Sequence, residues 1–126
     1  MSDPDAPYHA HVYYTRETRD VALALHRRLT AGTPGLLYVG QMRDRSVGPH
    51  PKPQFEVHFL AAERPRILAL LEASGLTALV HPLTDDDLAD HTTLAHWIGS
   101  PLPLDLATLD PPGVNQGVAR FGKSDV

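Results

Sequence analysis

Hydrophobic and polar positions alternate over several short stretches of this chain. Over residues 8–14, YHAHVYY, tyrosine, alanine and valine alternate with histidine and a second tyrosine, and this period of two is typical of a strand. The same alternation recurs over residues 54–60, QFEVHFL, and shorter apolar runs occupy residues 36–41 and 77–81. The pattern therefore predicts four strands.

Between these strands the period changes to that of a helix. Apolar residues recur at helical spacing over residues 18–31 and 63–74, and a glycine follows each segment as a helix C-cap. A third helix is predicted over residues 86–98, because acid-rich Asp85–Asp87 suits a helix start and Gly99 suits a helix end.

The predicted order is β-α-β-β-α-β followed by a helix. This order indicates an α+β fold of the ferredoxin-like type, an antiparallel sheet with two helices on one face, plus a C-terminal helix. We expect a flexible leader over residues 1–7, a single domain over residues 8–106, and an extended or loose tail over residues 107–126.

The polar residues of the predicted strands are expected to share one face. If the apolar residues face the helices, the polar ones must lie on the opposite, open face of the sheet. In this topology the first strand lies between the third and fourth strands and antiparallel to both. His9 and His11 of the first strand should then meet His81 of the fourth, with Glu56 or His58 approaching from the third.

This convergence of imidazoles and a carboxylate predicts a metal site. The chain has no cysteine, which excludes disulfides, iron–sulfur clusters and thiolate chemistry, and the remaining ligands suit iron, manganese, copper or zinc. Two histidines and a carboxylate on one side of an iron leave three positions, enough for the two oxygens of a catechol and for dioxygen. We expect His11, His81 and either Glu56 or His9 to hold Fe(II).

Charge and composition exclude other classes of function. The net charge is −4 and no run of Lys or Arg forms a stripe, which argues against a nucleic-acid partner or an anionic membrane surface. The N-terminal residues do not resemble a signal peptide, and no apolar stretch approaches membrane length, so we expect a cytoplasmic protein. We interpret His26 and His96 as solvated surface residues.

Four blocks of the sequence, in order, resemble the DOPA 4,5-dioxygenase family. They are YHAHVYY at 8–14, GPHPKPQFEVHF at 48–59, LVHP at 79–82 and DHTTLAHWIGSPLPLDL at 90–106. The resemblance implies a ferredoxin-like homodimer that opens the ring of a catechol such as DOPA with O2, by iron-dependent extradiol cleavage. The residues of this chain that fall in these blocks include His9, His11, His50, His81, His91 and Trp97.

The resemblance also suggests catalytic and substrate-binding candidates. His50, on a proline-bounded loop, and His91, on the predicted third helix, are the candidates for a general acid or base. Tyr13 and Trp97 could form an aromatic wall for the substrate ring, although core or dimer packing would also explain them. His58 is the third candidate for contact with the substrate.

Three other interpretations remain. The same fold could be a cofactor-free small-molecule binding or monooxygenase module, with no metal and an apolar open face. A zinc-dependent hydrolase would use a similar histidine site with one position open to water. A dioxygenase of the cupin type is disfavoured by the helical stretches after residues 18 and 63, because a cupin would continue in strands.

Overall fold

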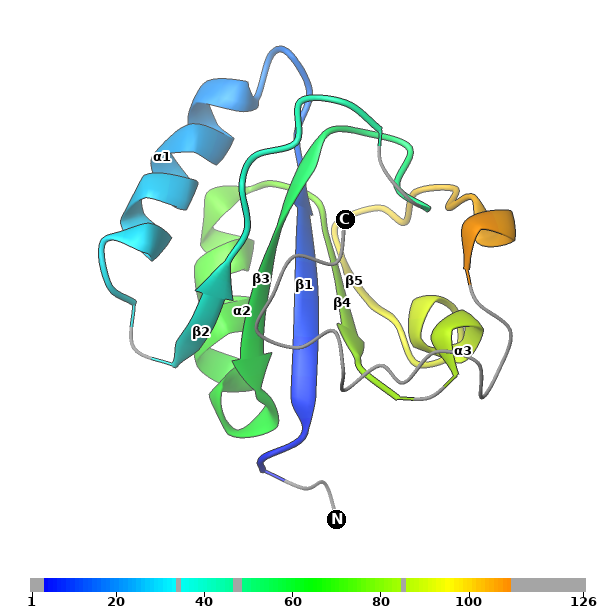
Figure 1. The fold of residues 1–126 in the computed structure, drawn as a ribbon. Coiled ribbons are helices and arrows are strands. Elements are labelled where there is room, and N and C mark those ends of the chain that lie inside the picture. Colours follow the sequence, from blue (N-terminus) through cyan, green and yellow to red (C-terminus); the bar gives the residue numbers. More distant parts are fainter. Residues whose placement is uncertain (1–3, 34, 47–48, 85, 110–126) are drawn as a thin grey trace.

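The computed structural model describes residues 4–33, 35–46, 49–84 and 86–109 of the chain (Figure 1). Strands and helices alternate along most of this length. The elements are β1 (Pro7–Tyr13), α1 (Arg19–Thr30), β2 (Leu36–Val39), β3 (Gln54–Leu60), η1 (Ala61–Glu63), α2 (Arg64–Ser74), β4 (Ala78–Pro82), α3 (Asp87–His91), β5 (His96–Ile98) and η2 (Leu106–Thr108). Two of them are short 3-10 helices, one between β3 and α2 and one after β5.

The strands form one antiparallel sheet in the order β2-β3-β1-β4-β5. As predicted, β1 lies between β3 and β4 and is antiparallel to both. The predicted α+β ferredoxin-like fold is confirmed, with β5 added at the edge of β4.

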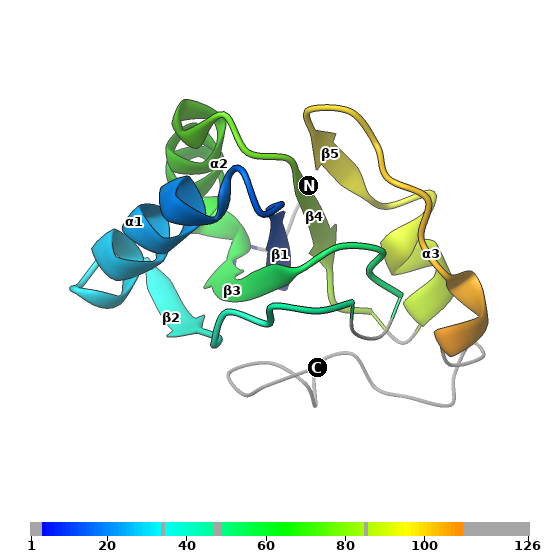
Figure 2. The same cartoon turned by 90° about the horizontal axis from the view of Figure 1, so that it is seen from above.

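The apolar residues of the strands face α1 and α2, which lie together on one side of the sheet (Figure 2). Alternation along each strand sends every second side chain to this layer, and the two helices cover it with residues at helical spacing. The central members of this core are Ala10, Val12, Phe55, Val57, Phe59, Ala78 and Val80 from the sheet, and Ala22, Leu25, Leu29, Ile67 and Leu71 from the helices.

The prediction of a third helix over residues 86–98 is wrong in its extent. Helix α3 ends at His91, and His96–Ile98 form strand β5, which pairs with β4. The open edge of β4 offers backbone hydrogen bonds, and an aromatic and a β-branched residue suit a strand, so tertiary pairing outweighs the helical pattern. Asp86 does begin α3, because its side chain accepts a hydrogen bond from the Ala89 N–H at 3.0 Å.

The chain ends also differ in detail from the prediction. Pro7, expected in the leader, is the first residue of β1, and the carbonyls of Pro4 and Ala6 accept backbone hydrogen bonds from the start of η1. Residues 1–3 of the predicted leader and 110–126 of the predicted tail lie outside the described residues, as does Asp85. Among the described helices, none is both long and apolar enough to cross a membrane.

The core assignment of α2 is testable by truncation of one leucine. Leu71→Ala should lower the free energy of unfolding by about 2–5 kcal/mol, because Leu71 is 1% exposed and its loss leaves a cavity. Leu37→Ala is the matched control; since Leu37 is 57% exposed, the change should stay within about 0.5 kcal/mol. Denaturant titration of both variants measures the difference, and equal effects would contradict this packing.

Candidate metal centre

Two adjacent rows of side chains cross the face of the sheet that points away from α1 and α2. In the first row, His9 on β1 is flanked by His58 on β3 and His81 on β4. In the second row, His11 on β1 is flanked by Glu56 on β3 and by Leu79. Strand register therefore brings the predicted histidines and the carboxylate together.

This face is buried, so the prediction of an open sheet face is wrong. His9, His11, His58 and His81 are fully buried, and Glu56 is 1% exposed. The loop between β2 and β3 and helix α3 lie on this side of the sheet (Figure 2). Six of the eight histidines are buried: His9, His11, His50, His58, His81 and His91.

His50 and His91 reach the cluster from these two covering segments. The His50 ring lies 4.1 Å from the His11 ring, and the His91 ring lies 4.3 Å from the His81 ring, centroid to centroid. Both candidates for acid or base therefore lie beside residues predicted as metal ligands. Strand pairing does not place them there, because neither lies on a strand.

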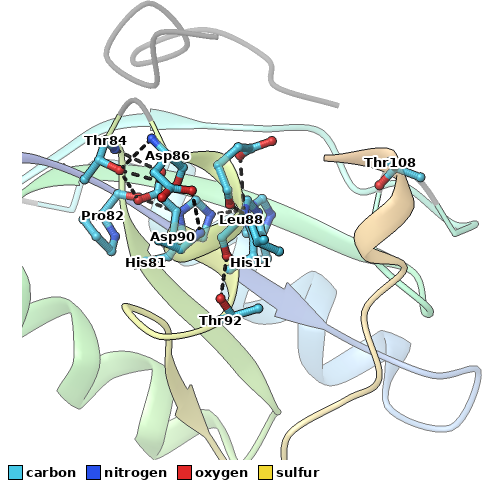
Figure 3. A network of polar contacts seen from close by, with 12 residues as sticks. His11, His81, Pro82, Thr84, Asp86, Leu88, Asp90, Thr92 and Thr108 are labelled. Atoms are coloured by element: carbon cyan, nitrogen blue, oxygen red, sulfur yellow. Dashed lines mark hydrogen bonds and ion pairs between the residues drawn. The ribbon is translucent and has the colours of Figure 1, made fainter. Parts of the chain in front are cut away.

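Helix α3 is held over the end of β4 by a network around Asp90 (Figure 3). The backbone N–H and the hydroxyl of Thr84 both donate to the buried Asp90 carboxylate, at 3.0 and 2.6 Å. The next residue is His91, whose Nδ1 donates to the Asp87 carbonyl, one turn back along the helix, at 2.8 Å. The network thereby sets where the His91 ring lies relative to His81.

The ring nitrogens of His11 and His81 have the arrangement expected of metal ligands. His11 Nδ1 lies 3.0 Å from Gln54 Oε1, and His81 Nδ1 lies 2.8 Å from the Pro82 carbonyl oxygen. Because each Nδ1 faces an acceptor, each ring is left with a lone pair on Nε2. The two Nε2 atoms are 3.0 Å apart, which is the separation of two ligands at right angles with bonds of about 2.1 Å.

His9 belongs to two groups of possible ligands. Ligand atoms of His9, His11 and His81 all lie within 4.8 Å of one another, and so do those of His9, Glu56 and His58. The rings of His9 and His58 stack at 3.6 Å with 13° between their planes, which prevents both lone pairs from meeting at one metal. Glu56 Oε2 lies 3.6 Å from His58 Nε2, so the structure brings this carboxylate to His58. The geometry thus favours His9 over Glu56 as the third ligand.

Burial favours the neutral form of His11, His50 and His81 at pH 7. It lowers the pKa of His11 to about 4, against the opposing effect of the Glu56 carboxylate. Burial also lowers the pKa values of His81 and His50, and neighbouring histidines lower them further. Neutral imidazoles can bind a metal without first losing a proton.

Aromatic side chains border the cluster beside His50. The Tyr13 hydroxyl lies 2.6 Å from His50 Nδ1, and the Tyr13 and Trp97 rings stack at 5.9 Å. Burial raises the pKa of Tyr13, so its hydroxyl keeps its proton and is able to donate to His50 Nδ1. When Tyr13 is the donor, neutral His50 carries its own proton on Nε2. Trp97 lies on β5 and not on the predicted third helix.

The environments of two residues, His26 and Gln54, differ from what the sequence predicted. His26, expected in solvent, is half-buried, donates from Nε2 to the Gly40 carbonyl at 2.8 Å, and meets the Phe55 ring edge-on. Gln54 was not among the candidates, yet it contacts His11. Its position on the polar side of the third strand was a signal that could have identified it. His96 is exposed, as predicted.

Two of the cavities lined by described residues have no buried histidine in their lining. A cavity of about 490 Å³ lies by α1 and α2, between Arg28 and Arg66. A smaller one of about 120 Å³ adjoins the site, because Tyr13, Lys52 and Leu102 are among its lining residues. Of the two, only the smaller lies on a side from which a ligand could approach the histidine cluster.

Comparison with known proteins identifies the family of this chain. The sequence model of the Dopa 4,5-dioxygenase family matches residues 8–108. The chain belongs to the Dopa 4,5-dioxygenase family. The match includes every residue of the histidine cluster, and membership supports a function of the dioxygenase type.

Two curated proteins are similar to most of this chain. A DOPA 4,5-dioxygenase of Amanita muscaria is 30% identical over 114 residues, which are 81% of this chain and 49% of the relative. An uncharacterised 21.2 kDa protein of Botryotinia fuckeliana is 30% identical over 113 residues, 79% of this chain and 61% of the relative. The chain thus spans about half to three-fifths of the length of these curated relatives.

A solved structure has the same fold. The crystal structure of a Nostoc punctiforme protein, provisionally described as a dioxygenase, has a TM-score of 0.75 and 34% sequence identity. The similarity covers 86% of this chain and 96% of that chain.

The neutral, buried histidines predict that acid destabilises the metal-free protein. The folded His11 pKa of about 4 lies below its ordinary value of 6.5, so between these values the unfolded chain binds more protons than the folded one. Stability should therefore fall as pH is lowered through this window, by about 1 kcal/mol per pH unit for each such histidine. Urea titrations from pH 7 to pH 5 measure the slope, and a flat profile would contradict neutral burial.

Proposed function

We propose that the protein is a non-haem Fe(II) extradiol dioxygenase that opens the ring of a catechol with O2. The observation that carries the proposal is the pair of Nε2 atoms of His11 and His81, 3.0 Å apart with both Nδ1 atoms facing acceptors. Membership of the Dopa 4,5-dioxygenase family supports the reaction class.

In this proposal His9, His11 and His81 hold the iron. Their ligand atoms lie within 4.8 Å of one another in a buried part of the sheet face. Three protein ligands leave room for further ligands on Fe(II), which would supply the positions for the two catechol oxygens and for O2. Glu56, opposite His11 across β1 and β3, adds a buried negative charge next to the cation.

His50 and His91 are proposed to move protons. Neutral His50, with its Nδ1 paired to the Tyr13 hydroxyl, can donate a hydrogen bond from Nε2 to an oxygen of the substrate or of O2, and it would act as an acid only after first taking up a proton. In His91 the two ring nitrogens have the opposite roles, because Nδ1 donates to the Asp87 carbonyl and Nε2 of the neutral ring is an acceptor. His91 is therefore the better candidate for the base that takes a proton from a catechol hydroxyl.

Tyr13, Trp97 and His58 are proposed to contact the substrate. The stacked rings of Tyr13 and Trp97 offer a flat apolar wall that matches an aromatic ring. DOPA is the catechol we propose first, since it is in the name of the Amanita muscaria relative. We also retain a single domain over residues 8–106 and a cytoplasmic homodimer as proposals.

A zinc-dependent hydrolase is the second candidate, because three histidines with an open position would also suit zinc. A cofactor-free monooxygenase module fits less well. It would have an apolar sheet face, whereas this face carries buried imidazoles and a carboxylate. The relatives favour oxygen chemistry over hydrolysis.

Replacement of the two central ligands tests the proposal. The protein is reconstituted with Fe(II) without oxygen, and bound iron and O2 uptake with a panel of catechols are measured. His11→Ala and His81→Ala should each lose iron and activity by more than the roughly 10–100-fold that changes in outer partners of a metal ligand cost. Yellow ring-opened product should form only with the wild-type chain and with controls.

His96→Ala is the matched control, because His96 is exposed on β5 and should keep full iron content and turnover. Unchanged iron and O2 uptake in both ligand variants would contradict the site. Stable zinc binding with no O2 uptake for any catechol would instead support the hydrolase.

A further inference from the structure

With the side chains oriented as in the structure, the metal-free protein cannot give every polar atom around His11 a hydrogen-bond partner. Pro82 offers only a carbonyl oxygen, so His81 Nδ1 must be the donor and neutral His81 Nε2 an acceptor. His11 Nδ1 faces Gln54 Oε1 and must also be a donor, which makes His11 Nε2 an acceptor too. Two lone pairs then face each other at 3.0 Å.

A cation between the two Nε2 atoms satisfies both lone pairs. Without a cation, the contact is favourable only if one Nε2 carries a proton, and the Pro82 carbonyl prevents His81 from being the donor. His11 must then donate from Nε2. Because full burial disfavours an imidazolium, neutral His11 gives up the proton on Nδ1, and Nδ1 becomes an acceptor facing the Gln54 amide.

Gln54 can accommodate either state of His11. Rotation of its amide by 180° exchanges Oε1 and Nε2 with little change of shape, so the same side chain can accept from Nδ1 or donate to it. Gln54 is fully buried, and its Nε2 has no hydrogen-bond partner among the residues that the structure describes. The amide therefore has a donor available for the second state.

We propose that Gln54 is a positioning residue whose amide rotates when metal binds, switching His11 from the Nε2–H to the Nδ1–H tautomer. Without metal, hydrogen bonds run in one direction, from Gln54 to His11, His81 and the Pro82 carbonyl. With metal, the His11 proton lies on Nδ1 and is held by Gln54 Oε1. The proton moves within one ring, so the switch itself changes the charge of neither histidine.

The inference rests on the metal site of the proposed function but not on catechol chemistry. Zn²⁺, which is diamagnetic, serves as the probe on the whole protein. In ¹⁵N-histidine-labelled protein, long-range proton–nitrogen correlations distinguish the tautomers, and comparison with His11→Ala assigns the signals. We expect the Nε2–H tautomer of His11 before Zn²⁺ is added and the Nδ1–H tautomer afterwards. An Nδ1–H tautomer without metal would overturn the switch.

Substitution of Gln54 tests the positioning role separately. Gln54→Met keeps the length of the side chain but removes both the donor and the acceptor, so Zn²⁺ affinity should fall about 10–100-fold, as for other outer partners of metal-binding histidines. Gln41→Met is the matched control, because Gln41 is an exposed glutamine in the loop after β2. Equal Zn²⁺ affinity of the two variants, measured by competition with a chromophoric chelator, would overturn the role of Gln54.

The two proposals fail in different ways. If the tautomer switches and Gln54→Met weakens Zn²⁺ binding, but no catechol supports O2 uptake, the inference about Gln54 stands and the dioxygenase proposal falls. If catechols are cleaved while the tautomer stays constant, the dioxygenase proposal stands and the switch is wrong. The wild-type spectrum decides the switch even if Gln54→Met does not fold.

Discussion

The antiparallel register of β1 between β3 and β4 is the constraint on which the site depends. It places His9 between His58 and His81, and His11 between Glu56 and Leu79. A shift of one residue in this register would turn the imidazoles into the apolar layer under α1 and α2 and expose the core residues of β1. The burial of Ala10 and Val12 on one face therefore also holds His9 and His11 in place on the other.

Burying several histidines in one layer lowers the stability of the folded protein, and hydrogen bonds with surrounding residues partly offset this loss. Each buried imidazole loses its contact with water, so its polar atoms need partners inside the protein. Carbonyl oxygens of Pro82, Asp87 and Gln54 satisfy three Nδ1 atoms, and the Tyr13 hydroxyl serves a fourth. These contacts also decide which nitrogen of each ring is free, so the same bonds that stabilise the layer determine its chemistry.

The two segments that cover the histidine face of the sheet add two further histidines to it. The loop between β2 and β3 brings His50, and α3, held through Thr84 and Asp90, brings His91. Gly40 shows how closely the loop approaches, because a Cβ atom there would lie 2.9 Å from Glu56 Cγ. Exclusion of water by these segments strengthens electrostatic interactions inside the cluster, which suits a site for a charged metal and an ionised substrate.

The sequence by itself determined the order of the first four strands and the face on which their polar residues gather, because the succession of strands and helices and a period of two suffice for that. These polar residues are His9, His11, Glu56, His58 and His81. Only the tertiary structure decided that this face is closed, that residues 96–98 pair with β4 rather than extend α3, and that His26 bonds to Gly40. These outcomes depend on loop paths and on an available sheet edge, which local periodicity does not encode. The choice between His9 and Glu56, and the contact of Gln54 with His11, likewise follow from ring orientations a few ångströms apart, which are set by packing.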